Sequence, residues 1–274
     1  MSPKVTVLMG TYNRAHMLEA TLKSIQQQIF TDWELIITDD GSKDNTVSVV
    51  EKLKEGESRI TFLRSEVNQG ISKNYNMGFA VARGEYIAMI DDDDPWLDPE
   101  KLGKQIQFLD SHKDFVGCGG GVVVIDEHGK EKYRYLKPET DAEIRKYMLY
   151  SNPMANSTTL FRLEAAKKVD LYDSSIRYAG DRDFWLKMGL VGKLYNFPEY
   201  FSYYTMTGNN TSIAKIKPHL KTALIVMKRY KYDYPNYYSA LLMNELQYAY
   251  AFLPEGFRRM IHQSMARLKR AVVK

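Results

Sequence analysis

Apolar and polar positions follow two different periodicities over the first 110 residues of the chain. Short runs rich in Val, Ile and Leu have the pattern of buried strands, and each is followed by a stretch in which apolar residues recur every three or four positions. Alternation of strands and helices over this length predicts parallel strands joined by right-handed crossovers, and so an α/β fold. The predicted strands are residues 4–9, 33–37, 60–63 and 86–90, and the predicted helices include residues 17–25, 47–53, 70–82 and 102–109.

The C-terminal part of the chain continues with helical periodicity. Four apolar side chains between residues 220 and 230 are spaced as one helix face, and residues 236–252 have the pattern of a second helix. We therefore expect a domain over residues 1–214 and a helical extension over residues 215–274.

Charge is distributed unevenly between these two parts. The whole chain has 38 Lys and Arg against 34 Asp and Glu, which gives a net charge of +4. From Lys215 onward there are 12 bases and three acids, which leaves 26 bases and 31 acids in residues 1–214. A basic extension can bind nucleic acid, but no recognised nucleic-acid motif occurs, so we expect no nucleic-acid partner.

The last segment, residues 254–274, combines an apolar stripe with basic side chains. This pattern is typical of a helix that lies in a lipid headgroup layer, which makes an anionic membrane surface one candidate partner. Packing of the segment on the rest of the chain, or on a second subunit in a homodimer, is equally compatible with the pattern. The stripe consists of Phe257, Met260, Ile261, Met265, Leu268 and Val272.

Composition is that of an ordinary globular protein, with 44% apolar and 26% charged residues among 274. The single cysteine, Cys118, excludes an internal disulfide and fits a reducing compartment. We expect no signal peptide, because the first residues run directly into a strand pattern. No apolar run approaches the roughly 20 residues of a membrane span. We therefore expect a cytoplasmic protein, with any membrane contact peripheral and on the inner face of the plasma membrane.

Four consecutive aspartates, Asp91 to Asp94, follow the apolar run of residues 86–90. Adjacent carboxylates repel one another, so folding alone does not favour them. A bound Mg²⁺ or Mn²⁺ would remove the repulsion, because hard divalent cations prefer carboxylate and phosphate oxygens. Alternation along an extended segment predicts that Asp91 and Asp93 point the same way and Asp92 the opposite way. The cluster indicates a metal that binds a diphosphate; the alternative is a solvated acidic turn.

Polar clusters follow three of the predicted strands, at residues 11–14, 39–42 and 91–94. In open α/β sheets ligands bind beyond the carboxyl ends of the strands, so three such clusters favour a nucleotide site. Asp40 could accept hydrogen bonds from the edge of a base, and Tyr12 could stack on its face. Residues 39–42 taken alone are compatible with a simple turn.

Five segments occur in a fixed order along the chain: residues 7–14 (VLMGTYNR), 34–44 (ELIITDDGSKD), 68–78 (NQGISKNYNMG), 84–94 (GEYIAMIDDDD) and 180–185 (GDRDFW). Together they resemble the family-2 glycosyltransferases of the GT-A fold, over roughly residues 4–214. The resemblance implies a Rossmann-like mixed sheet flanked by helices, a nucleotide-sugar donor, a divalent cation and inversion at the anomeric carbon.

The resemblance also implies roles for individual residues. Thr11, Tyr12 and Asp40 would contact the nucleoside, usually uridine, and Asp92 would face the ribose. Lys73 lies where a basic residue could approach the diphosphate, although an exposed helix lysine is an equally good interpretation. The predicted nucleotide-binding residues are Thr11, Tyr12, Asn13, Arg14, Asp40, Lys73 and Asp92, and the predicted metal ligands are Asp91 and Asp93.

Asp181 occupies the position of the family's catalytic base. A hydroxyl that attacks opposite a leaving diphosphate needs a carboxylate within hydrogen-bond reach to take its proton. Asp183 is two residues away and would point elsewhere on a helix, where we expect a structural ion pair with Arg182 or Lys187. Phe184 and Trp185 are expected in the core.

Two positions depart from the family pattern. Thr207 stands where relatives often have a histidine before Gly-Asn-Asn, and Asn156 also replaces a histidine found in many relatives. A third metal ligand therefore cannot be carried over, and none of the five histidines falls at a matching position.

We expect an inverting glycosyltransferase that moves a hexose-type sugar from a UDP-sugar to a hydroxyl of a glycan or lipid-linked acceptor, in bacterial cell-surface polysaccharide biosynthesis. The alternatives are a non-catalytic nucleotide-sugar or glycan-binding relative and a sugar-phosphate nucleotidyltransferase. The nucleotidyltransferase would need a glycine-rich loop, which residues 10–14 do not provide. A dinucleotide oxidoreductase would need a G-x-G-x-x-G motif after the first strand.

Overall fold

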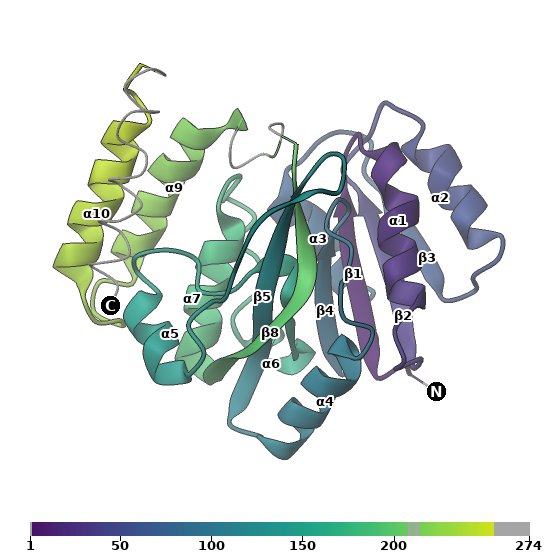
Figure 1. Cartoon of the computed structure of the whole chain (residues 1–274), viewed down its shortest axis with the longest axis horizontal. Helices are drawn as coiled ribbons and strands as arrows, with labels where there is room; N and C mark the ends of the chain where they lie inside the picture. Colours follow the sequence, from purple (N-terminus) through teal and green to yellow (C-terminus); the bar gives the residue numbers. More distant parts are fainter. Residues whose placement is uncertain (1, 208–209, 211–213, 255–274) are drawn as a thin grey trace.

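The computed structural model describes residues 2–207, 210 and 214–254, which form one central sheet with helices on both faces (Figure 1). Its strand order is β3-β2-β1-β4-β7-β5-β6, and β8 pairs with β5 outside this path. The strands are β1 (Val5–Thr11), β2 (Trp33–Asp39), β3 (Ile60–Arg64), β4 (Tyr86–Asp91), β5 (Phe115–Asp126), β6 (Glu131–Tyr135), β7 (Leu160–Arg162) and β8 (Lys193–Met206).

The first half of the sheet is parallel, as the sequence predicts. β1 lies between β2 and β4 and pairs with both in parallel, and β2 pairs in parallel with β3. Each of the four predicted strands is present. Three of them, β1, β2 and β4, extend into the polar clusters that follow the apolar runs.

The second half makes the sheet mixed. β7 pairs antiparallel with both β4 and β5, β6 pairs antiparallel with β5, and β8 runs parallel to β5. The α/β fold with a mixed sheet is therefore confirmed.

Two hydrophobic clusters fill the two faces of the sheet, because side chains alternate along each strand. Val7 and Met9 of β1 pack with α1, α2 and α4, whereas Leu8 packs on the other face with α3 and α7. The helices are α1 (Ala15–Gln26), α2 (Thr46–Lys54), α3 (Ile71–Phe79), α4 (Lys101–Ser111), α5 (Asp141–Tyr147), the 3-10 turn η1 (Asn156–Thr158), α6 (Leu163–Lys168), α7 (Gly180–Val191), α9 (Ile216–Arg229) and α10 (Tyr237–Tyr250).

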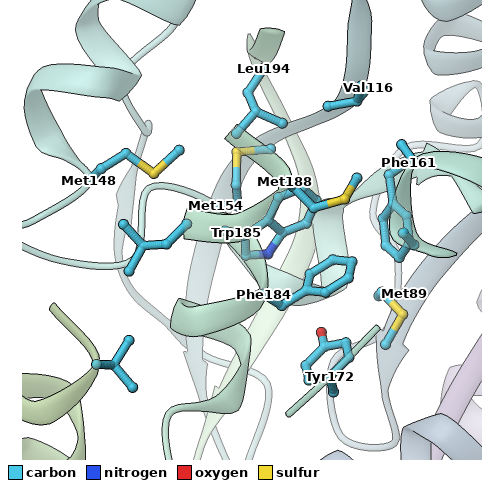
Figure 2. Packing of buried hydrophobic residues seen from close by; sticks show 14 of the residues in the cluster. Met89, Val116, Met148, Met154, Phe161, Tyr172, Phe184, Trp185, Met188 and Leu194 are labelled. Carbon is cyan, nitrogen blue, oxygen red and sulfur yellow. The ribbon is translucent and has the colours of Figure 1, made fainter. Parts of the chain in front are cut away.

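The helix α7 is held in the centre of one of these clusters (Figure 2). Phe184 and Trp185 are fully buried, as expected from the sequence. The ring of Phe184 stacks on Tyr172 with centroids 4.6 Å apart, and Phe161 meets the Trp185 ring edge-on at 5.5 Å. This packing fixes the direction of α7 and of the residues at its first turn.

The extension helices α9 and α10 pack on α7, on the side away from the sheet's parallel half (Figure 1). The Tyr230 hydroxyl donates to Asp183 Oδ1 at 2.9 Å, and the Tyr234 hydroxyl donates to the Leu186 carbonyl at 2.6 Å. Arg182 reaches Asn244 Oδ1 of α10 at 3.0 Å. Both helices predicted in the extension are therefore present, and four of their side chains belong to the same core as Trp185: Val226, Met227, Ala240 and Met243.

Among the helices of the described residues, none is long and apolar enough to cross a bilayer. The segment 254–274, with its predicted apolar stripe, lies outside the described part of the chain apart from Pro254.

Candidate active site

Two of the three predicted polar loops are joined by Asn13, which lies between β1 and α1. Its φ of 54° is in the left-handed region, which Asn tolerates better than most residues. The Asn13 N–H donates to Ser42 Oγ at 2.8 Å, and its side-chain oxygen accepts the Lys43 N–H at 2.7 Å. Residues 11–14 and 39–42 therefore lie side by side, and hydrogen bonds from Asn13 hold the two loops together.

Asp40 is buried beneath the loop that leads into α3. Its two carboxylate oxygens accept the backbone N–H groups of Gln69 at 2.7 Å and Gly70 at 2.9 Å. The next residue, Gly41, has a φ of 78°, and a Cβ there would lie 2.9 Å from the Val67 carbonyl carbon, so only glycine fits. A carboxylate has about four lone-pair sites, so Asp40 keeps acceptor capacity beyond these two bonds.

The acidic cluster forms a turn after β4. The strand ends at Asp91, and the Asp94 N–H donates to the Asp91 carbonyl at 3.1 Å. One guanidinium nitrogen of Arg14, Nη1, lies 2.9 Å from Asp92 Oδ1 and 2.7 Å from Asp93 Oδ2. The prediction that Asp92 and Asp93 point opposite ways is therefore wrong, because side-chain alternation stops where the strand gives way to the turn.

This turn holds more negative charge than Arg14 balances. Burial raises the pKa of Asp93 to about 7, although the Arg14 charge acts to lower it. Burial also raises the pKa of Asp92 and, together with the charges of its neighbours, that of Asp94. The burial of Arg14 would lower its own pKa, but Asp92 and Asp93 outweigh that effect and raise it. The turn would therefore be stabilised by further positive charge.

The donor set fits a hard divalent cation. Within the described residues no three His, Cys, Asp or Glu side chains are grouped to enclose a metal. Mg²⁺, however, is usually bound through one or two carboxylates, with substrate phosphates and water completing its shell. Burial raises the pKa of Asp93, and the buried Asp92 Oδ2 has no hydrogen-bond partner among the described residues. Both observations fit a turn that binds an external cation or donor group.

The flanking carboxylates of the cluster are fixed by hydrogen bonds. Asp91 Oδ1 accepts the Tyr75 hydroxyl at 2.6 Å and Asn156 Nδ2 at 2.8 Å. Asp94 is buried, and its oxygens accept Ser157 Oγ at 3.0 Å and the Thr205 N–H of β8 at 3.1 Å. Asp91 is thus oriented at the rim of the site, whereas Asp94 ties the turn to β8 and η1.

The remaining predicted nucleotide-binding residues differ in their positions. Tyr12 is 43% exposed, so its ring is free to stack on a base. Thr11 is buried and its hydroxyl interacts favourably with Asp92, without a hydrogen bond of good geometry to any described residue. Lys73 is exposed on α3 and makes no ion pair with a described residue. This position is compatible with a contact to the diphosphate and with an exposed helix lysine.

The predicted base, Asp181, lies in the first turn of α7, after Ala179 in the left-handed conformation. It is partly exposed, and its Oδ2 accepts Asn152 Nδ2 at 2.7 Å. Asp183 is buried on another side of the helix and lies 3.6 Å from Lys187 Nζ. The expected ion pair with Lys187 is therefore confirmed, whereas Arg182 turns away from Asp183 toward α10.

One short segment contacts both the acidic turn and Asp181, the two carboxylate centres of the site. Asn152 contacts Asp181, and four residues later Asn156 contacts Asp91. The acidic turn and the predicted base therefore flank the same short stretch of chain.

Sequence reasoning missed three residues at this site. Tyr75 and Asn152 reach Asp91 and Asp181 from distant parts of the chain. Tyr75 lies within the recognised segment 68–78, but no sequence pattern indicates either contact. His219 of α9 is near enough to Asp181 for their charges to interact, and burial lowers its pKa. His219 falls at no matching position of the family pattern, so the sequence does not indicate it.

Comparisons with known proteins agree with this geometry. Residues 6–170 match the family model described as glycosyl transferase family 2. EpsE of Bacillus subtilis, whose name describes a glycosyltransferase, is 33% identical over 201 residues, covering 72% of this chain and 71% of its own length. The amylovoran biosynthesis glycosyltransferase AmsE of Erwinia amylovora is 29% identical, covering 71% of this chain and 73% of its own.

Solved structures show the same fold at low identity. TarS 1–349 of S. aureus in complex with UDP-GlcNAc superposes with a TM-score of 0.67 at 20% identity, over 91% of this chain and 73% of that one. The longer TarS structure is matched over only 43% of its length. The mannosyltransferase PcManGT of Pyrobaculum calidifontis, in complex with GDP-Man and Mn²⁺, gives 0.63 at 16% identity, over all of this chain and 84% of that one. The chain belongs to glycosyltransferase family 2 and is a glycosyltransferase with the GT-A fold.

Proposed function

We propose that the protein transfers a hexose-type sugar, with inversion, from a UDP-sugar to a hydroxyl of a glycan or lipid-linked acceptor. The observation that carries this proposal is the pair of carboxylate centres, Asp91 to Asp93 and Asp181, on either side of the segment that contains Asn152 and Asn156. One centre suits a diphosphate with its cation, and the other suits a hydroxyl that must lose a proton.

In the proposed reaction, Asp181 accepts the proton of the acceptor hydroxyl as its oxygen attacks the anomeric carbon. The new carbon–oxygen bond forms on the face opposite the bond to the diphosphate, which breaks and leaves UDP with the electron pair. A carboxylate is a weak base at neutral pH, but it is sufficient when the proton moves late in the transition state. Partial exposure of Asp181 leaves room for the acceptor to approach.

Asp93, supported by Asp91, would hold the divalent cation, Mn²⁺ or Mg²⁺. When bound, the cation supplies Lewis-acid stabilisation of the departing diphosphate, so no protein acid is required. Arg14 would then be released in part from Asp93 and could pair with phosphate oxygens, for which a guanidinium is well suited. Tyr12, Asp40 and Asp92 would bind the nucleoside.

Donor and acceptor are inferred from relatives as well as from chemistry. One structural neighbour is a complex with UDP-GlcNAc. Over 96 residues, 35% of this chain, the sequence is 45% identical to a Campylobacter jejuni glucosyltransferase named for an undecaprenol-linked acceptor, which is matched over 31% of its own length. These names, with that of AmsE, favour a role in polysaccharide biosynthesis, and we propose that the product is a cell-surface polysaccharide made at the cytoplasmic face of the plasma membrane.

A nucleotide-sugar screen tests the proposed donor. UDP-sugars should raise the melting temperature in the presence of Mn²⁺ and be slowly hydrolysed to UDP, and GDP- and ADP-sugars should do neither. Binding that is indifferent to the metal, or stronger for a purine nucleotide, would overturn the UDP assignment. Binding without any turnover of any donor would favour the non-catalytic relative.

We further propose that the extension contacts an anionic membrane. In the described part, Tyr238 of α10 is 75% exposed, Leu242 of α10 is 60% exposed, and Phe252, just beyond the end of α10, is 55% exposed. Lys217 of α9 lies over the Phe252 ring at 4.5 Å, and Lys231 lies 5.6 Å from the Tyr238 ring. Exposed apolar and aromatic groups beside lysines suit a headgroup layer.

Removal of residues 254–274 should abolish salt-sensitive binding to anionic vesicles while hydrolysis of free donor is largely kept. Each Lys or Arg near such a surface contributes about 1 kcal/mol, and the attraction is screened within a Debye length. The cut after Leu253 removes none of the contacts that α9 and α10 make with α7. Sedimentation with vesicles at low and high salt is the measurement, with neutral vesicles as the control. Full-length protein that ignores anionic vesicles at low salt would contradict the proposal, as would a truncated chain that unfolds.

A further inference from the structure

The side chain of Asn152 is held in one orientation by its own loop. Its Oδ1 accepts the Met154 N–H at 3.1 Å, and its backbone carbonyl accepts Lys137 Nζ at 3.0 Å. Because the amide oxygen is engaged by a backbone donor, the amide nitrogen must point the other way. That nitrogen donates to Asp181 Oδ2 at 2.7 Å.

This bond distinguishes the two oxygens of Asp181. Oδ2 is engaged by Asn152, whereas the hydrogen bonds between described residues leave Oδ1 open. Asp181 is partly exposed, and Oδ1 is the oxygen that keeps its acceptor capacity for an incoming hydroxyl. A carboxylate with one oxygen fixed cannot rotate freely about its terminal bond, and the other oxygen is held in one direction.

The loop of Asn152 is itself fixed at both ends. The Leu149 carbonyl accepts Arg182 Nη2 at 2.6 Å and Asn244 Nδ2 at 3.0 Å, which ties the loop to α7 and α10. At the other end, Ser157 Oγ donates to Asp94 and its carbonyl accepts Trp96 Nε1 at 2.7 Å. None of these contacts depends on the Asn152 side chain, so the bond to Asp181 is not needed to hold the loop in place.

We propose that Asn152 is the positioning residue of the base: it fixes Asp181 Oδ2 and thereby directs Oδ1 toward the acceptor hydroxyl. This inference rests on the proposed role of Asp181. It assigns to Asn152 no contact with donor or acceptor.

Asn152→Ala should lower kcat by roughly 10- to 100-fold, the size expected for losing a hydrogen bond to a charged group and the alignment it provides. The KM for donor should stay within about twofold, because the nucleotide lies at the acidic turn. The measurement is UDP release from UDP-glucose and UDP-GlcNAc with Mn²⁺ present. The same substitution in the Asp181→Asn background should cause no further loss, since the two residues would act as one unit.

Two further variants separate positioning from structure. Asn152→Asp keeps the oxygen that accepts the Met154 N–H and replaces only the donor, so it should fold and lose kcat at least as much as Asn152→Ala. Asn236→Gly removes a hydrogen bond from a side-chain amide to the Lys146 carbonyl and no contact with Asp181 or Asn152, so it should behave as the parent protein.

The outcomes distinguish this inference from the proposed function. Full activity of Asp181→Asn would overturn the role of the base and the inference with it. If Asp181→Asn is inactive but Asn152→Ala and Asn152→Asp keep the parent kcat, only the positioning role is wrong. An additive loss in the double variant, or a loss that appears in the donor KM, would also overturn it.

Discussion

Replacing Asp181 with Asn is expected to lower kcat by about 10²–10⁴ while donor affinity stays nearly unchanged, the usual range for removing a general base. The asparagine can still accept Asn152 Nδ2 through its amide oxygen, so the geometry of the first turn of α7 should persist. An interaction made only in the transition state affects kcat without raising KM. Steady-state kinetics of UDP release, with a titration of donor binding, give both values.

A matched control for this substitution lies in the segment that precedes α7. Asp170 is exposed and has a φ of 56°, a conformation that Asn accepts readily, so Asp170→Asn makes the same chemical change away from the site. It should keep the parent kcat. If the loss in Asp181→Asn falls mainly on the donor KM, Asp181 is a binding residue and another group must take the proton.

Asp93→Ala is expected to abolish transfer and Mn²⁺-dependent nucleotide binding without lowering the free energy of unfolding. The carboxylate is buried among like charges, which together with burial raise its pKa, so its removal relieves an unfavourable arrangement. Arg14 remains 2.9 Å from Asp92 and keeps a partner. Thermal unfolding and nucleotide titrations with and without Mn²⁺ measure the two effects.

The control for this prediction is Asp114→Ala, which removes an exposed carboxylate that pairs with Lys193 at 2.8 Å. It should leave metal-dependent binding unchanged, and any change in stability should be small, as is usual for surface ion pairs. Turnover that survives in Asp93→Ala, or full activity of the parent protein in excess chelator, would contradict the metal assignment.

Sequence patterns within short windows predicted the features that depend on interactions between neighbouring residues. The parallel strands and the buried Trp185 follow from periodicity and recognised motifs. The wrong prediction for Asp92 and Asp93 is also local. Side chains alternate inside a strand, but these two residues lie in the turn that follows β4.

Contacts between distant parts of the chain had no such signal. Asn152 meets Asp181 across 29 residues, and Tyr75 meets Asp91 across 16. The antiparallel pairing of β7 with β4 and β5 joins three segments, and the residues of these segments do not indicate their order in the sheet. Such pairings are decided by the packing of whole elements, which periodicity does not describe.

The contacts between the extension and α7 limit where this chain could be joined to a homologous chain in a chimera. Arg182, Asp183 and Leu186 all have partners in α9, α10 or the connection between them, through Asn244, Tyr230 and Tyr234. A chimera joined at residue 214 would separate these pairs and leave the Asp183 carboxylate and the Arg182 guanidinium buried with foreign neighbours. Exchange of α7 between homologues would therefore require a crossover before α5 or after α10, so that α7 and its supporting helices are inherited as one block.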